Sequence, residues 1–108
     1  MSTITALPVE RDPEYGFWTH PAFDDLCGER EGVPFSEFRE WLDTNGLESV
    51  TEYMDSIDDK SVLAEHELFG TFIQWQPESP HGDGWFIGSI HDTEDGPVCI
   101  WLREVKYD

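Results

Sequence analysis

Two apolar stretches near the end of the chain decide the fold, Trp85-Phe-Ile-Gly-Ser-Ile-His91 and Val98-Cys-Ile-Trp-Leu-Arg-Glu-Val105. Between them lies the segment Asp92-Thr-Glu-Asp-Gly-Pro97, whose residues are typical of turns. This arrangement predicts an antiparallel hairpin, with strands at 85–91 and 98–105 and a positive φ at Gly96.

The segment before the hairpin also has the pattern of a strand. Thr71-Phe-Ile-Gln-Trp-Gln76 alternates between apolar and polar residues and ends at Pro77. Alternation with period two predicts a strand at 71–76, followed by a loop over 78–84. The end of the chain is therefore expected to form a three-stranded antiparallel sheet.

Earlier in the chain, apolar residues recur with the period of a helix. The clearest case predicts a helix at 35–45, with Pro34 at its start and Gly46 at its end. The apolar face of this helix is expected to contain Phe35, Phe38, Trp41 and Leu42.

Two further helices are predicted before the sheet. Ser49 and Glu52 match a capping box, which favours a helix at 50–57 whose apolar residues are Val50, Tyr53, Met54 and Ile57. A third helix is expected at 61–69, with Gly70 at its end. Its N-cap candidates are Asp58, Asp59 and Ser61, and its apolar stripe is Val62, Leu63, His66 and Phe69. Helices followed by an antiparallel sheet predict an α+β fold.

The remaining residues suggest one compact domain over 1–108. Residues 1–14 lack periodicity and are expected to form a loose arm or a short edge strand, residues 15–23 an extended stretch or short turn across the core, and residues 24–32 an acidic loop. Phe17, Trp18, Trp75, Trp85 and Trp101 are expected mostly in the core, with Trp75 or Trp101 as a candidate exposed anchor for an interface.

The charge of the chain restricts its partners. There are 24 Asp and Glu residues against 6 Lys and Arg, which gives a formal net charge of −18. Such a field repels nucleic acid and anionic membranes, and it attracts basic proteins. Because folding concentrates this charge, we also expect a marginal stability that rises with added salt.

The density of charge argues against a uniform copy of DNA. A compact chain of 12.5 kDa exposes on the order of 6,000 Å², or about 250 Å² for each carboxylate. Duplex DNA carries one charge per ~100 Å² of a cylinder ~10 Å in radius. Mimicry of DNA would therefore require the acids to gather on one side.

The acids are concentrated between Asp24 and Glu67, where fourteen of them face Arg30, Arg39 and Lys60. We expect the carboxylates on the predicted helices to pair with Lys and Arg residues of a basic partner. The candidate partner-binding residues are Glu37, Glu40, Asp43, Glu52, Asp55, Asp58 and Asp59.

Signals for catalysis or for a cofactor are weak. Cys27 and Cys99 do not form a C-x-x-C site, and neither His20 with Cys27 nor His91 with Cys99 has a spacing that specifies a nucleophile and a base. His81, Asp83, His91, Asp92, Glu94 and Asp95 crowd around the hairpin without the spacing of a metal site. We predict no catalytic residue, no metal and no cofactor.

The stretches Gly16-Phe-Trp-Thr-His-Pro21 and Gly84-Trp-Phe-Ile-Gly-Ser-Ile-His-Asp-Thr-Glu-Asp-Gly-Pro-Val98, followed by Trp101, resemble small acidic proteins encoded by prophages and other mobile elements. The resemblance covers about a third of the chain and carries no established activity. It implies a context, because small acidic phage proteins often block host defence enzymes, including restriction and CRISPR complexes, sometimes by imitating DNA.

Together, these observations predict a non-enzymatic acidic inhibitor that binds a basic nucleic-acid-handling protein, such as a nuclease or a restriction or CRISPR component. One alternative is an immunity protein or antitoxin that neutralises a nuclease toxin, and another is a structural or assembly protein of a virion. The chain has no run of about 18 apolar residues, and its start lacks the basic residues of a signal peptide, so a cytoplasmic location is expected.

Overall fold

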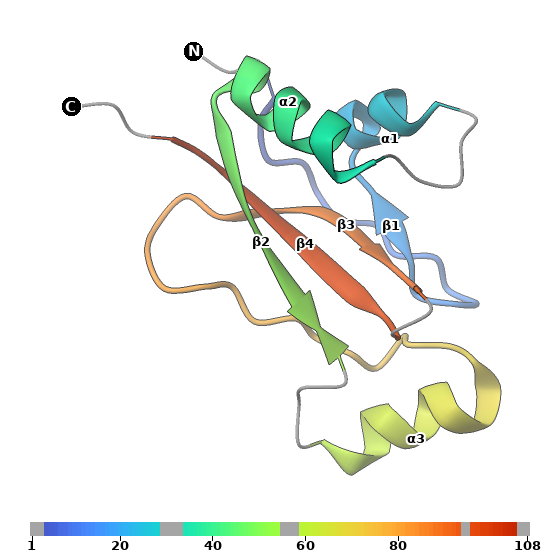
Figure 1. Cartoon of the computed structure of the whole chain (residues 1–108). Helices are drawn as coiled ribbons and strands as arrows, with labels where there is room; N and C mark the ends of the chain where they lie inside the picture. Colours follow the sequence, from blue (N-terminus) through green and yellow to red (C-terminus); the bar gives the residue numbers. More distant parts are fainter. Residues whose placement is uncertain (1–3, 29–33, 55–58, 94–95, 106–108) are drawn as a thin grey trace.

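The computed structural model describes residues 4–28, 34–54, 59–93 and 96–105. Its elements, in chain order, are β1 (Trp18–Thr19), α1 (Pro21–Cys27), α2 (Phe35–Asn45), β2 (Leu47–Tyr53), α3 (Lys60–Phe69), β3 (Phe86–His91) and β4 (Val98–Glu104). The α+β class is confirmed. Figure 1 shows α1 and α2 at one end of the sheet and α3 at the other.

The predicted hairpin is confirmed and forms the middle of a four-stranded antiparallel sheet in the order β1-β3-β4-β2. Gly96 has the expected positive φ of 101°. The register shifts at Gly88, where an added Cβ would lie 2.7 Å from Leu102 Cδ1. A β-bulge therefore occurs at a glycine that packs directly against the neighbouring strand.

The prediction of a helix at 50–57 was wrong, because residues Leu47–Tyr53 form strand β2 (residues 55–58 lie outside the described part of the chain). All seven residues of β2 pair with β4, from Leu47 opposite Glu104 to Tyr53 opposite Val98. The capping box does not form, and the Glu52 carboxylate accepts the Trp101 Nε1–H at 3.0 Å instead. Pairing along a whole strand outweighs the propensity of a short apolar pattern.

The prediction of a strand at 71–76 was also wrong, and so was the three-stranded sheet. Phe72 and Trp75 are both buried although they are three residues apart, whereas a strand places such residues on opposite faces. The Trp75 N–H donates to the Phe72 carbonyl at 3.2 Å. These residues form a turn against the core. In the sheet, β1 pairs with β3, through Trp18 opposite Ile90, and β2 pairs with β4.

The helix predictions at 35–45 and 61–69 are confirmed by α2 and α3. Pro34 precedes α2, Asp59 caps α3 through the backbone N–H of Ser61, and Gly46 and Gly70 end the two helices with positive φ. The predicted apolar faces were wrong at two positions, since Phe35 and Phe69 are both exposed.

The sequence did not predict α1. Residues 21–23 were expected in an extended stretch and 24–27 in an acidic loop, but both belong to this helix. The buried His20 begins α1, since its Nδ1 accepts the Ala22 N–H at 3.0 Å while its Nε2 donates to the Thr5 carbonyl at 2.7 Å. Pro21 suits the first turn, where no backbone N–H is needed.

The two faces of the sheet have separate cores. On one face, buried residues come from the position just after β2, from α3, from the turn at 72–75 and from β3 and β4, namely Met54, Val62, Phe72, Trp75, Ile90, Cys99 and Trp101. On the other face, Leu42 of α2 packs with Leu47 and Leu102, with Phe38, Trp41 and Phe86 around them. Trp75 and Trp101 are only 2% and 7% exposed, so the prediction of either as an exposed anchor was wrong.

Candidate protein-binding surfaces

Two of the described cations, which are partly buried, bond to other groups of the protein. The Arg11 guanidinium donates to the carbonyl oxygens of Gly16 at 2.8 Å and Phe72 at 2.5 Å, and also to that of Trp75. Arg103 forms an ion pair with Glu48 and lies 4.4 Å from the centre of the Trp85 ring. Both cations therefore stabilise the fold through contacts with its own groups.

Most of the described acids are exposed. They occur on every side of the fold: on α1 and α2, around the N-terminal turn, on α3, in the loop after residue 77 and at the end of β4. The exposed cations among the described residues are Arg39 on α2 and Lys60 at the start of α3. The outer surface is thus strongly negative over its whole extent.

The predicted partner-binding acids do not lie on one helical surface. Glu37, Glu40 and Asp43 belong to α2, while Asp59 caps α3 at the opposite end of the sheet (Figure 1). Glu52 lies on β2 between them and already accepts the Trp101 N–H and the backbone N–H of Glu78. Asp55 and Asp58 fall outside the described residues. Glu40 and Asp43 are exposed, so α2 retains the densest part of the predicted set.

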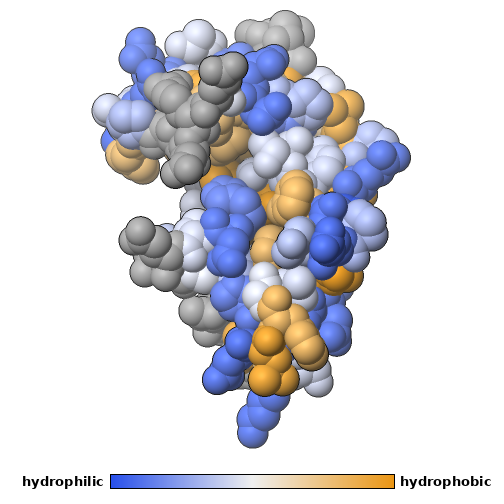
Figure 2. All heavy atoms as spheres, turned by 90° about the vertical axis from the view of Figure 1, so that its right-hand side faces the viewer, coloured by the Kyte–Doolittle hydropathy of each residue, from blue (hydrophilic) through white to orange (hydrophobic). Residues whose placement is uncertain are grey.

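A group of exposed apolar residues gathers where α3 ends. Leu68 and Phe69 are 72% and 74% exposed, and Ile73, Tyr15 and Phe17 are each more than a third exposed. We call these five residues the apolar end. Figure 2 shows apolar side chains at the α3 end of this side of the molecule, with hydrophilic ones beside them.

The apolar end is held together by the backbone. The Phe72 N–H donates to the Tyr15 carbonyl at 2.9 Å, and the Tyr15 and Phe17 rings stack with their centres 6.4 Å apart. Gly16 lies between them with a φ of 101°, and a Cβ there would come within 2.9 Å of the Ile73 nitrogen. This surface was not predicted from the sequence. The one signal for it is the pair of adjacent apolar residues Leu68 and Phe69, because adjacent residues of a helix point in different directions and cannot both face the core.

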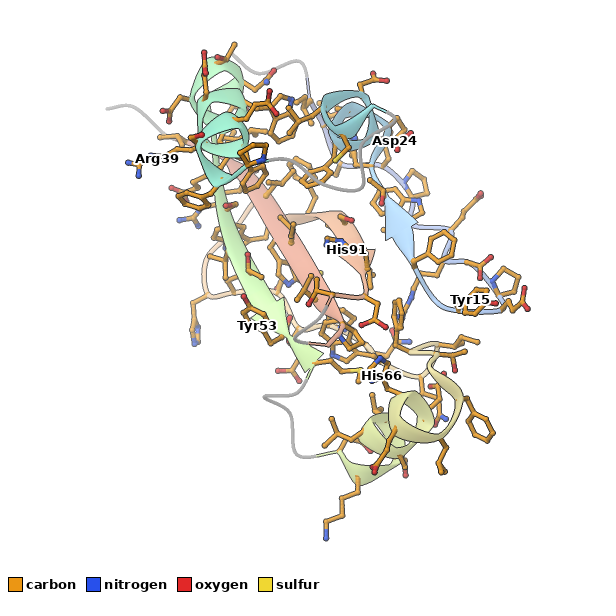
Figure 3. All side chains as sticks on the ribbon, turned by 45° about the vertical axis from the view of Figure 1, so that its right-hand side comes forward. Tyr15, Asp24, Arg39, Tyr53, His66 and His91 are labelled. Atoms are coloured by element: carbon orange, nitrogen blue, oxygen red, sulfur yellow. The ribbon has the colours of Figure 1, made fainter. Side chains whose placement is uncertain are left out.

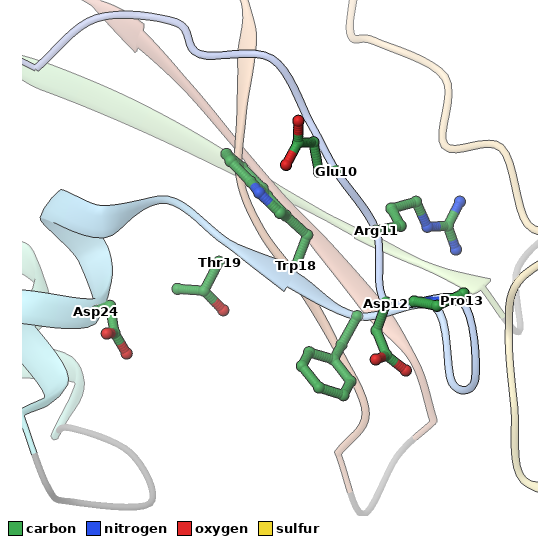
Figure 4. Close-up of a pocket in the computed structure, with 8 residues that line it drawn as sticks. Glu10, Arg11, Asp12, Pro13, Trp18, Thr19 and Asp24 are labelled. Atoms are coloured by element: carbon green, nitrogen blue, oxygen red, sulfur yellow. The ribbon is translucent and has the colours of Figure 1, made fainter.

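A shallow pocket of about 640 Å³ lies next to the apolar end and shares Phe17 with it. Glu10, Asp12 and Asp24 contribute carboxylates to its lining, and Phe17 and Trp18 contribute rings. In Figure 4 the Arg11 guanidinium points away from the acids, in agreement with its bonds to the carbonyls. Carboxylates and rings together suit a cationic side chain better than an anion.

A short chain of polar groups lies on β1 and β3, on the same face of the sheet as Ile100. Thr19 Oγ1 lies 3.1 Å from Ser89 Oγ, which lies 2.8 Å from His91 Nδ1. Burial lowers the pKa of His91, and the nearby Asp92 opposes that shift. Figure 3 shows His91 on the sheet between Asp24 above and His66 below. Ser89 is only 1% exposed, so this chain joins β1 to β3 within the fold.

The cysteine and histidine pairs considered from the sequence are not brought together. His91 lies opposite Val98 and Ile90 opposite Cys99, so the His91 and Cys99 side chains lie on opposite faces of the sheet. Burial and the Glu52 carboxylate raise the pKa of Cys99 to about 12, which keeps the thiol protonated. His20 uses both ring nitrogens to hold the start of α1 and the N-terminal arm.

Within residues 4–28, 34–54, 59–93 and 96–105, no group of three or more His, Cys, Asp or Glu residues is arranged to hold a metal ion. His66 Nε2 lies 3.0 Å from Asp92 Oδ2, whereas Glu94 and Asp95 fall outside the described residues. In the same part of the chain, each helix is too short or too polar to cross a membrane.

Comparisons with protein-family models, with curated proteins and with solved structures gave no match. The resemblance to small acidic prophage proteins therefore stays a prediction.

Proposed function

We propose that the protein is a non-enzymatic acidic inhibitor that binds a basic nucleic-acid-handling protein, in the manner of phage proteins directed against restriction or CRISPR complexes. The observation that carries the proposal is the excess of exposed carboxylates over exposed cations among the described residues. Arg11 and Arg103 bond to groups of the protein itself, while most described acids face solvent. A basic surface would therefore meet a negative field from any direction of approach.

The field acts mainly on the rate of encounter. Complementary charges raise association rate constants by about 10- to 1,000-fold at low ionic strength, and salt removes this gain. The accessible surface of 7385 Å² shared among 24 acids gives about 300 Å² for each, several times the area per charge of duplex DNA. This spacing favours steering followed by local contacts over an imitation of DNA across the whole surface.

The local contacts are available at two places. Glu40 and Asp43 on α2 present carboxylates to solvent, where they can pair with Lys or Arg residues of the partner. The apolar end offers Phe69 and Tyr15 as large anchors, with the exposed Glu14 and Glu67 beside them in sequence. An apolar centre beside charged residues is the usual arrangement of a protein interface.

The first test is capture of partners from a lysate of the cells that encode the protein. The tagged protein is used as bait at about 50 mM and about 300 mM salt, and the retained proteins are identified. We expect a basic nuclease, polymerase or defence-complex subunit that is lost at the higher salt. Retention of only its own copies, or of partners unaffected by salt, would overturn the proposal.

A pair of charge-matched variants tests the place of contact. Glu40→Lys with Asp43→Lys reverses the exposed acids of α2, and Glu78→Lys with Asp83→Lys makes the same change of net charge in a loop. If α2 contacts the partner, the first variant loses at least tenfold more retained partner than the second. Equal losses would mean that only the overall charge matters.

A further inference from the structure

Strand β2 lies at one edge of the sheet and has β4 as its single neighbour (Figure 1). The backbone bonds at the two ends of this pairing fix its phase. The Met54 N–H donates to the Pro97 carbonyl at 2.9 Å, and the Val105 N–H donates to the Gly46 carbonyl at 2.8 Å. Because antiparallel bonding alternates, residues 48, 50 and 52 bond to β4 and residues 47, 49 and 51 direct their backbone groups outward.

This outward edge is open in the middle of the strand. In the described part of the chain, the backbone N–H groups of Ser49 and Thr51 make no hydrogen bond to another residue. Thr51 is exposed and Val50 is 40% exposed, so neither is covered by a loop. An exposed edge strand is a template on which another strand can pair.

The side chains of β2 select what kind of strand can pair there. Glu48, Val50 and Glu52 lie on one face, opposite Arg103, Trp101 and Cys99 of β4. In a second copy paired antiparallel along the whole strand, Glu48 would lie directly opposite Glu52. Like charges opposite each other destabilise a sheet, and the net charge of −18 on each copy adds repulsion. Pairing with a second copy is therefore disfavoured.

We propose that the β2 edge binds a β-strand of the basic partner by addition to the sheet. The strand has Lys or Arg opposite Glu48 and Glu52 and an apolar residue opposite Val50, which gives the pattern basic-x-apolar-x-basic. Backbone bonds to Ser49 and Thr51 provide the pairing. The carboxylates of Glu48 and Glu52 already accept from Arg103 and from Trp101 and Glu78, respectively, and their remaining lone pairs set the register of the added strand. This inference rests on the proposed function for the basic nature of the partner.

The test uses a proline that removes one outward N–H. Thr51→Pro lacks that donor but leaves the bonds of β2 to β4 intact, because proline is tolerated on the solvent side of an edge strand. Thr51→Ala keeps the donor and serves as the control. The free energy of unfolding of both variants is measured in urea, so that a loss of fold is not mistaken for a loss of binding.

The probe is the synthetic peptide Thr-Lys-Thr-Val-Thr-Lys-Thr, and the same peptide with Glu in place of Lys is its control. We expect the Lys peptide to slow hydrogen exchange at the Ser49 and Thr51 amides of the wild-type protein at least tenfold. Thr51→Ala should bind it within threefold of wild type, and Thr51→Pro at least tenfold more weakly. Equal binding to both variants, or protection confined to other amides, would overturn the inference.

The lysate experiment separates this inference from the proposed function. If wild type and Thr51→Pro capture the same salt-sensitive basic protein equally, the partner does not use the β2 edge, although the proposed function stands. If the wild type captures no basic protein while the Lys peptide protects Ser49 and Thr51, the edge binds basic strands and the proposed function fails.

Discussion

The carboxylate of Glu65 on α3 accepts the backbone N–H of Gln74 at 2.9 Å, nine residues further along the chain. The same carboxylate accepts the Ile73 N–H at 3.0 Å and the Thr71 hydroxyl. One buried side chain, only 8% exposed, thus satisfies the backbone of the turn that carries Phe72 and Trp75 into the core. Arg11 donates to the carbonyls of the same turn from the other side.

Glu65→Ala should destabilise the protein by about 3 kcal/mol, because it removes three hydrogen bonds to a charged acceptor and the negative charge near Arg11. The free energy of unfolding is measured in urea. Glu67→Ala, an exposed position on the same helix, should change it by less than about 0.5 kcal/mol. A loss below about 1 kcal/mol for Glu65→Ala would mean that the turn does not depend on this carboxylate.

The pH dependence of stability follows from the same group. Burial favours a higher pKa for Glu65, but the hydrogen bonds from Thr71, Gln74 and Ile73, together with Arg11, hold it below its ordinary value of 4.5. A lowered folded pKa gives stability that is present above the unfolded pKa and is lost as the pH falls through the folded pKa. The advantage of wild type over Glu65→Gln should therefore shrink as the pH falls below about 4.5.

His91 acts in a different pH window. Burial lowers its pKa from 6.5, so the folded state favours the neutral ring. Stability should therefore fall as the pH falls from about 6.5 toward the lower folded pKa, where the unfolded chain binds the extra proton. The measurement is the difference in unfolding free energy between wild type and His91→Gln at each pH. Taking the difference cancels the contribution of the carboxylates, which both proteins share. A difference that stays constant from pH 7.5 to 5 would contradict this assignment.

The elements that could be predicted from the sequence are those whose signals are local. The hairpin was predictable because its two strands are adjacent in sequence and Gly96 supplies the turn. The helices α2 and α3 were predictable because local caps, such as Asp59 and Gly46, mark their ends. Each of these signals acts within a few residues.

The errors occurred where distant residues decide the structure. Residues 47–53 are a strand because β4 pairs with them from about fifty positions away, and residues 71–76 are a turn because Glu65 and Arg11 bind their backbone. The candidate acids on α2 were predictable from composition and period. The apolar end was not, because the bond from the Phe72 N–H to the Tyr15 carbonyl joins Tyr15 and Phe17 to the turn after α3, and no local pattern reports this contact.

The two cysteines should react with a thiol reagent at different rates. Cys99 is buried and its pKa is raised to about 12, so at pH 8 it should be unreactive until the protein unfolds. Cys27, which is partly exposed at the end of α1, should react in the folded state. Labelling with a chromogenic disulfide in the presence and absence of urea measures both reaction rates. The variants Cys27→Ser and Cys99→Ser show which cysteine gives which rate. Fast labelling of Cys27→Ser in the folded state would contradict the position of Cys99 in the core.

Phe69 and Phe72 form a matched pair for the apolar end, because they are close in sequence but differ in burial. Phe72→Ala should cost about 3–5 kcal/mol of stability, since it opens a cavity in the core. Phe69→Ala should change stability by less than about 0.5 kcal/mol. If Phe69 anchors a partner, Phe69→Ala should nevertheless lower capture from lysate at least tenfold. A large loss of stability for Phe69→Ala would mean that the residue is part of the core.

The excess of negative charge should make stability depend on salt. Exposed carboxylates repel one another across the surface. Arg11 bonds to backbone carbonyls and Arg103 pairs with Glu48, so few cations remain to offset this repulsion. Raising the ionic strength from about 10 mM to about 300 mM shortens the screening length from ~30 Å to below 10 Å, so the free energy of unfolding in urea should rise by roughly 1–2 kcal/mol. Sodium chloride and potassium chloride should act alike, because screening does not depend on the identity of the cation. A stability that falls with salt would mean that attractive ion pairs, such as Arg103 with Glu48, outweigh the repulsion.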